Sequence, residues 1–201
     1  MIKLDAATVL LQWATGGLFF LWFTTRSHGI GRGYGWLIRG TYAAIAVGAV
    51  ASAYAIGWVP VRDVSAGIVA VVSLGTLRRT DVRWDLVAPL VGLVGVIVGA
   101  LDAASGTADS VVSLLRVLVG TVFLGAVSDA MLLGHWYLVQ PGLPRRHLND
   151  LVRALAIVWP VEVVSMLLPR PPLLLLALVL LCRASEKATF PTKEPRPSGA
   201  S

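Results

Sequence analysis

The sequence predicts an all-α, polytopic membrane protein with about seven transmembrane helices. Hydrophobic residues make up 56% of the 201 residues, charged residues make up only 14%, and the mean hydropathy is +0.77. A soluble domain usually carries about 25% charged residues. The apolar residues also gather in long runs, and about 20 of them are needed for one span. We therefore expect a multi-pass protein of the cell (cytoplasmic) membrane, with the lipid bilayer as its main partner.

Seven hydrophobic segments follow one another along the chain. Their predicted limits are Ala6–Thr24, Thr41–Val59, Val64–Leu77, Leu86–Leu101, Val111–Val139, Leu151–Leu168 and Leu173–Cys182. These segments form one predicted bundle, residues 1–184. Residues 185–201 are rich in Pro, Lys, Glu and Ser, so they cannot bury a core and are expected to form a disordered cytoplasmic tail.

Each segment has its own justification. We do not expect the first to be a signal peptide, because it lacks an A-x-A cleavage site and its flanking charge lies mostly after it. The second is rich in small residues from Ala43 to Ala53, which suits close helix packing. The third and the seventh are short, so either could be tilted, re-entrant or longer than drawn. The fourth contains Gly92, Gly95 and Gly99, which indicate either a dimer seam or close packing inside one bundle. The fifth is long enough to project beyond the bilayer.

Basic residues alternate between the two sides of the predicted membrane. One side has Arg26, Arg32, Arg39, Arg78, Arg79, Arg83, Arg145, Arg146, Arg153, Arg183, Lys187, Lys193 and Arg196, and the other has only Lys3, Arg62, Arg116 and Arg170. Because cytoplasmic loops carry the excess of Lys and Arg, this pattern predicts an external N-terminus and a cytoplasmic C-terminus. It also explains the net charge of +6 without nucleic acid as a partner.

Two acidic residues are predicted deep in the membrane. Counted from the cytoplasmic ends of their segments, Asp129 and Glu162 each lie about 16 Å deep, near the midplane. Pro160, just before Glu162, frees a backbone carbonyl one turn earlier. Buried acids are costly in hydrocarbon, so the pair predicts a proton or small-cation site. The alternative is structural: both acids could be protonated and hydrogen-bonded, or could pair with Arg116 or Arg153.

A second group of polar residues lies in the same fifth segment, near its cytoplasmic end. His135, Trp136 and Tyr137 could line a pocket for haem b or a quinone, and Ser128 shares a helix face with His135. Ligation of haem by two histidines would need a loop histidine or a partner subunit. The alternative is a hydrogen-bonded interface histidine. Metal-binding spacings such as H-x-x-x-H are absent from the sequence, and no metal ligand is assigned.

The loop between the fifth and sixth segments carries two adjacent arginines in a rigid turn. Arg145 and Arg146 follow Pro141, Gly142 and Pro144, and their position predicts binding to anionic lipid head groups.

Three functions remain open from these features. The leading one is a non-catalytic subunit or accessory protein of a respiratory or redox membrane assembly, with a quinone or haem pocket near His135 and with other membrane subunits as partners. The second is a small proton- or cation-coupled transporter that uses Asp129 and Glu162. The third is a structural membrane protein with a lipid-binding cytoplasmic face. A retinal protein is excluded, because Lys3, Lys187 and Lys193 all lie outside the predicted spans. No catalytic residue is assigned.

Overall fold

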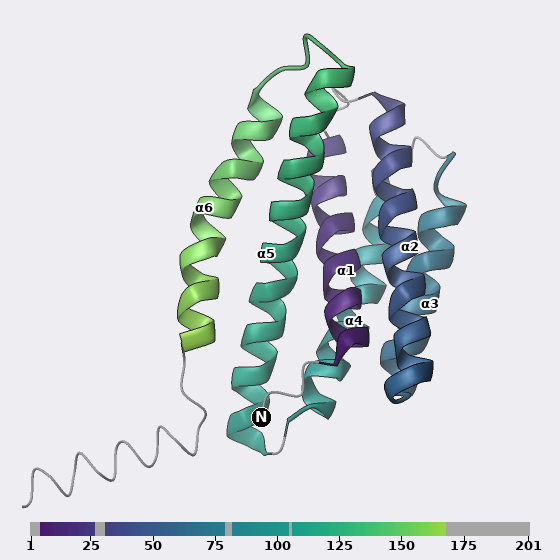
Figure 1. Cartoon of the computed structure of the whole chain (residues 1–201), viewed down its shortest axis with the longest axis vertical. Helices are drawn as coiled ribbons and strands as arrows, with labels where there is room; N and C mark the ends of the chain where they lie inside the picture. Colours follow the sequence, from purple (N-terminus) through teal and green to yellow (C-terminus); the bar gives the residue numbers. More distant parts are fainter. Residues whose placement is uncertain (1–4, 27–30, 79–81, 105, 168–201) are drawn as a thin grey trace, which may run out of the picture. The chain divides into compact units, whose positions relative to one another are not determined.

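The computed structural model describes residues 5–26, 31–78, 82–104 and 106–167, and all regular structure in these ranges is helical (Figure 1). The elements are α1 (Ala6–Thr25), α2 (Arg32–Ile56), α3 (Pro60–Gly75), the 3₁₀ helix η1 (Val82–Leu86), α4 (Val87–Asp102), α5 (Thr107–Val139) and α6 (Arg146–Leu167). The all-α class is therefore confirmed for the described residues. The predicted seventh segment, Leu173–Cys182, and the predicted tail, 185–201, lie outside them.

Four helical stretches are long and apolar enough to cross a membrane. They are Ala6–Thr25, Gly33–Ile56, Trp84–Asp102 and Asp109–Val139. Helix α3 has only 16 residues, and α6 opens with polar residues, so neither belongs to this group on length and composition. The lengths and composition of the four stretches are those of a membrane protein.

Several helices begin before the apolar runs that predicted them. Helix α2 begins at Arg32 rather than Thr41, and α6 begins at Arg146 rather than Leu151. The prediction followed hydrophobicity, but a helix can continue through polar residues when its backbone hydrogen bonds are made internally. Helix α3 begins at Pro60, where proline suits the first turn because its missing N–H would have no helical partner there.

Helix α1 lies at the centre of the packing. It contacts α2, α4 and α5, while α5 also packs against α6, and Figure 1 shows α1 between α2 and α5. Leu11 and Leu21 of α1 are completely buried. On α2 one buried stripe follows helical spacing, and it contains Tyr34, Ile38, Tyr42, Ala46, Ala49 and Ala53. This stripe turns α2 toward α1.

Glycines allow the helix backbones to come close. A Cβ atom on Gly16 would overlap the carbonyl oxygen of Thr121, and one on Gly125 would overlap the backbone of Gly16, so α1 and α5 cross in direct backbone contact. The glycines of α4 likewise face side chains of α1 and α3, namely Gly92 against Thr15, Gly95 against Leu11 and Ser65, and Gly99 against Thr8 and Arg62. Of the two predictions for the α4 glycines, close packing inside one bundle is the one confirmed.

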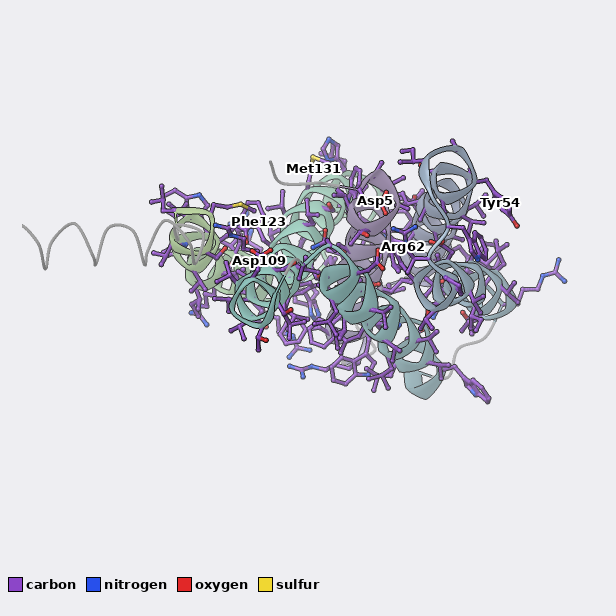
Figure 2. The ribbon with its side chains drawn as sticks, turned by 90° about the horizontal axis from the view of Figure 1, so that it is seen from below. Asp5, Tyr54, Arg62, Asp109, Phe123 and Met131 are labelled. Atoms are coloured by element: carbon purple, nitrogen blue, oxygen red, sulfur yellow. The ribbon has the colours of Figure 1, made fainter. Side chains whose placement is uncertain are left out.

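Two buried ion-pair groups join neighbouring elements. The guanidinium of Arg39 on α2 contacts Asp85 of η1, with Nη2 and Oδ1 2.6 Å apart. Arg62 of α3 contacts Asp63, with Nε and Oδ1 2.6 Å apart, and also pairs with Asp5 at the start of α1 (Figure 2). These two arginines, which the charge pattern counted as loop residues, therefore form internal connections.

Candidate functional site

Asp129 lies on the buried face of α5. Its side chain has no solvent-accessible surface, with 0% of the residue exposed. Oδ1 accepts a hydrogen bond from the hydroxyl of Tyr42 on α2 at 2.5 Å. Oδ2 has no hydrogen-bond partner among the described residues. A buried carboxyl group with an oxygen that lacks a donor avoids the cost of a buried charge when it carries a proton or binds a small cation.

A glycine on α1 lets Tyr42 reach Asp129. A Cβ atom on Gly17 would overlap the ring of Tyr42, so the phenol occupies the space that a side chain at Gly17 would take. Tyr42 belongs to the buried stripe of α2, which directs it toward α1 and, past it, to α5. The site is thus built from three helices. Tyr42 and Gly17 were not identified from the sequence as partners of Asp129. The features that could have indicated them are a tyrosine within an apolar run and the Gly16–Gly17 pair.

Ser128 is next to Asp129 but faces a different helix. Its Oγ donates to the carbonyl of Leu124 at 2.7 Å and accepts from Nε1 of Trp13 on α1 at 2.6 Å. Ser128 is 8% exposed, whereas His135 is exposed. The predicted common site of Ser128 and His135 is therefore not assembled, because the serine is committed to the α1–α5 contact.

The three consecutive residues His135, Trp136 and Tyr137 point in separate directions. Nδ1 of His135 lies 2.8 Å from the carbonyl oxygen of Met131 in its own helix. Trp136 packs against Tyr34 of α2, with ring centroids 5.9 Å apart. The hydroxyl of Tyr137 donates to the carbonyl of Pro144 at 2.7 Å. Because consecutive helical residues are about 100° apart, these side chains do not converge on one ligand within the described chain.

Glu162 is half-buried on α6 and lies beside Gly120, not beside Asp129. A Cβ atom on Gly120 would be 3.7 Å from Oε1 of Glu162 and 3.5 Å from Nε2 of Gln12. Ser165 donates to Oε2 of Glu162 at 3.4 Å. Gly120 and Asp129 are nine residues apart on α5, which corresponds to about 13 Å along the helix. The structure therefore does not bring the two acids together.

The difference follows from where α6 begins. The prediction placed Glu162 eleven residues from the start of its helix, at Leu151, but α6 begins at Arg146. Glu162 is thus about 24 Å along α6, while Asp129 is about 15 Å from the end of α5 at Val139. The five extra residues at the start of α6, about 7.5 Å of helix, move the two acids to different levels.

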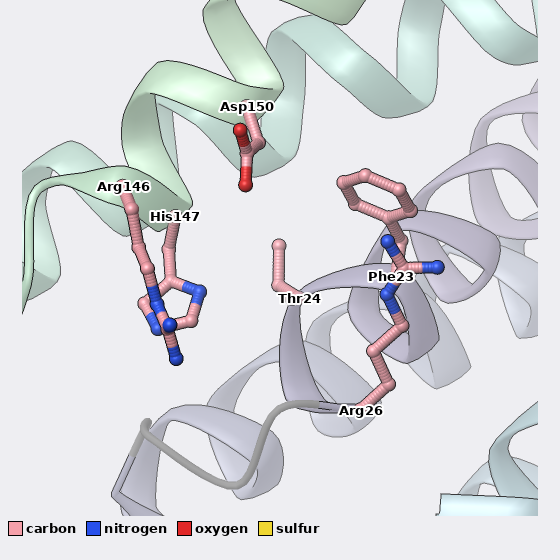
Figure 3. A pocket seen from close by; sticks show the side chains of 6 residues that line it. All are labelled: Phe23, Thr24, Arg26, Arg146, His147 and Asp150. Carbon is pink, nitrogen blue, oxygen red and sulfur yellow. The ribbon is translucent and has the colours of Figure 1, made fainter.

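A pocket of about 190 Å³ lies between the C-terminal end of α1 and the first turn of α6 (Figure 3). Its lining residues are Phe23, Thr24, Arg26, Arg146, His147 and Asp150, and we name it the α1–α6 pocket. Burial lowers the pKa of His147, the nearby Arg146 lowers it further, and Asp150 acts in the opposite direction. Of the two predicted head-group arginines, Arg146 lines this pocket and Arg145 does not.

No protein-family model, curated protein or solved structure matches this chain. A functional proposal therefore rests on the chemistry of the residues just described.

Proposed function

We propose that this protein is a proton-coupled transporter of the cell membrane and that Asp129 is its proton-binding group. The observation that carries the proposal is the Oδ2 atom of Asp129, which is fully buried and lacks a hydrogen-bond partner among the described residues. An ionisable group at such a position is expensive to maintain, and in membrane proteins it commonly belongs to a proton or ion pathway. The Tyr42 hydroxyl supplies a donor that would stabilise the carboxylate after the proton leaves.

A proton fits this site better than a metal cation. Cations such as Ca²⁺ need six to eight oxygen ligands, and Mg²⁺ needs six. Among the described residues, the hydroxyl of Tyr42 is the group hydrogen-bonded to the carboxyl group of Asp129. Ser128 Oγ already bonds Leu124 and Trp13. Glu162 of α6 is the second acid in this proposal. It is half-buried beside Gly120, which lies about 13 Å from Asp129 along α5, and it would exchange protons nearer the surface of the bundle.

The proposal includes the seven-span topology with an external N-terminus and a cytoplasmic C-terminus. In support, the first loop and the end of α5 meet at one end of the bundle, where the backbone N–H of Gly31 donates to Oε1 of Gln140 at 3.1 Å. Two arginine-bearing connections thus share one end, as the positive-inside rule requires of a cytoplasmic face.

Single cysteines at Gly57 and Pro141, in a Cys182→Ser background, test this orientation with a membrane-impermeant maleimide. Labelling of intact cells at Pro141 but not at Gly57 would refute the orientation.

Proton binding is tested with the purified full-length protein. Infrared difference spectra across a pH step should contain a carboxyl C=O band that disappears in Asp129→Asn. The same variant in proteoliposomes with a trapped pH dye should lose proton uptake driven by a potassium diffusion potential. Asp102→Asn is the matched control, because Asp102 is an exposed acid at the end of α4. Uptake by Asp129→Asn plus Glu162→Gln equal to that of the Asp102→Asn control would refute the transport mechanism.

A second candidate function is the membrane subunit of a redox assembly. The observation that favours it is the exposed ring of His135, whose Nδ1 faces the Met131 carbonyl. That contact favours the tautomer with the proton on Nδ1, which leaves the Nε2 lone pair for a ligand on the outer face of α5. Haem iron, or a quinol whose hydroxyl donates to Nε2, held with a partner subunit has the matching chemistry. A visible spectrum of the complex purified from native membranes should show a Soret band that is lost in His135→Ala. If the band and electron transfer are unchanged in that variant, this candidate fails.

A further inference from the structure

The α1–α6 pocket combines a cavity with positive charge contributed by two helices that are far apart in sequence. Arg26 is the residue after the last turn of α1, and Arg146 is the first residue of α6. The Arg26 guanidinium lies over Phe23, 4.2 Å from the ring centroid, and this cation–π contact favours its position at the pocket wall. In Figure 3 the side chains of Arg146 and His147 lie next to each other on the opposite wall.

The first turn of α6 also has backbone N–H groups that have no partner within the helix. The first hydrogen bond of the helix runs from the N–H of Asn149 to the carbonyl of Arg145 at 3.0 Å. The N–H groups of Arg146, His147 and Leu148 therefore precede the helical bonding pattern, at the positive end of the helix dipole. Such an end, together with two arginines, suits an anion with several oxygens.

The one acidic residue of the pocket has a basic neighbour outside it. Asp150 Oδ1 lies 4.0 Å from Nη1 of Arg153, one turn along α6. Both side chains of that pair are largely exposed, at 80% for Arg153 and 48% for Asp150, so solvent screens the acid. With two arginines and one aspartate, the lining carries a net positive formal charge.

The volume limits the ligand. Pockets for drug-sized molecules and cofactors usually measure about 300–1,000 Å³. A pocket of about 190 Å³ is too small to enclose a nucleotide but has room for a phosphate group whose remaining atoms extend outward. We propose that the α1–α6 pocket is a binding site for a phosphate group, with Arg26 and Arg146 as its charged ligands. The group can come from free phosphate or from the head group of an anionic phospholipid, because the pocket adjoins two helix ends of a membrane protein.

The test uses full-length protein and separates the two sources. In the first arm, inorganic phosphate is titrated by calorimetry into protein in a neutral detergent, with chloride at matched ionic strength as the reference. In the second arm, native mass spectrometry counts lipids that remain bound after extraction from nanodiscs of phosphatidylcholine alone or with phosphatidic acid. Saturable binding in either arm supports the site and identifies its source.

Substitutions then assign the binding to the pocket. Arg26→Gln and Arg146→Gln should each weaken binding about tenfold, because each removes charge-assisted hydrogen bonds to the anion. Arg145→Gln is the matched control, since it removes the same charge from the adjacent residue outside the pocket lining. Arg26→Lys and Arg146→Lys, which keep the charge, should retain part of the affinity and show that the variants fold. The proposal is overturned if neither arm shows binding, or if Arg145→Gln weakens it as much as Arg146→Gln.

Discussion

The Tyr42–Asp129 hydrogen bond offers the most direct test of the buried site. Tyr42→Phe keeps the ring that packs against Gly17 and removes only the hydroxyl, 2.5 Å from Oδ1 of Asp129. Both residues are 0% exposed, so water does not replace the lost donor. Intramembrane hydrogen bonds average about 0.6 kcal/mol, with a maximum near 1.7 kcal/mol. Because this acceptor would be left without any partner, we expect a loss of about 1.7 kcal/mol in the free energy of unfolding.

The assay is reversible unfolding in mixed micelles at increasing SDS, followed by circular dichroism. Tyr137→Phe is the control, because its hydroxyl also donates a hydrogen bond but lies at the end of α5, where water can compensate; we expect a loss of less than about 0.5 kcal/mol. A double-mutant cycle with Asp129→Asn isolates the pair. The reasoning is refuted if Tyr42→Phe costs no more than Tyr137→Phe, or if the coupling to Asp129 is zero.

Three further predictions concern packing, charge and pH. Gly125→Ala should lower the free energy of unfolding by at least about 2 kcal/mol in the same assay, since its Cβ would overlap α1. Gly134→Ala, with open space around it, should leave that free energy unchanged. Equal losses in the two variants would contradict the helix crossing. Asp85→Ala should cost about 3 kcal/mol because it leaves Arg39 buried without its partner, and the simultaneous Arg39→Met should recover part of that loss. Burial lowers the pKa of His147 in the native state, so the contribution of this group to stability should be complete above about pH 6.5 and should fall below it, where the unfolded state takes up more protons. His147→Gln should flatten that pH dependence in thermal unfolding, and an unchanged slope would show that another group causes it.

Some residues of the candidate site could be identified from the sequence, and others only from the structure. Asp129 could be found from the sequence, because a carboxylate in a long apolar run stands out without any knowledge of its neighbours. Its pairing with Tyr42 could not, because contacts between helices depend on which face of each helix is buried. Of the residues that line the α1–α6 pocket, the sequence had assigned a role only to Arg146, since nothing in the sequence links Arg26 to the start of α6.

The sequence by itself determined the all-helical class of the described residues and where their apolar stretches lie. Both depend on composition and on runs of apolar residues, which are local properties of the chain. Only the tertiary structure decided the rotation and the relative level of the helices. The backbone contact between Gly16 and Gly125 fixes how α5 faces α1, and it directs Asp129 inward while His135 points outward. The start of α6 at Arg146 sets the level of Glu162 beside Gly120. A shift of a few residues in a helix start moves a side chain by several ångströms and turns it to another face, and hydrophobicity alone does not detect that shift.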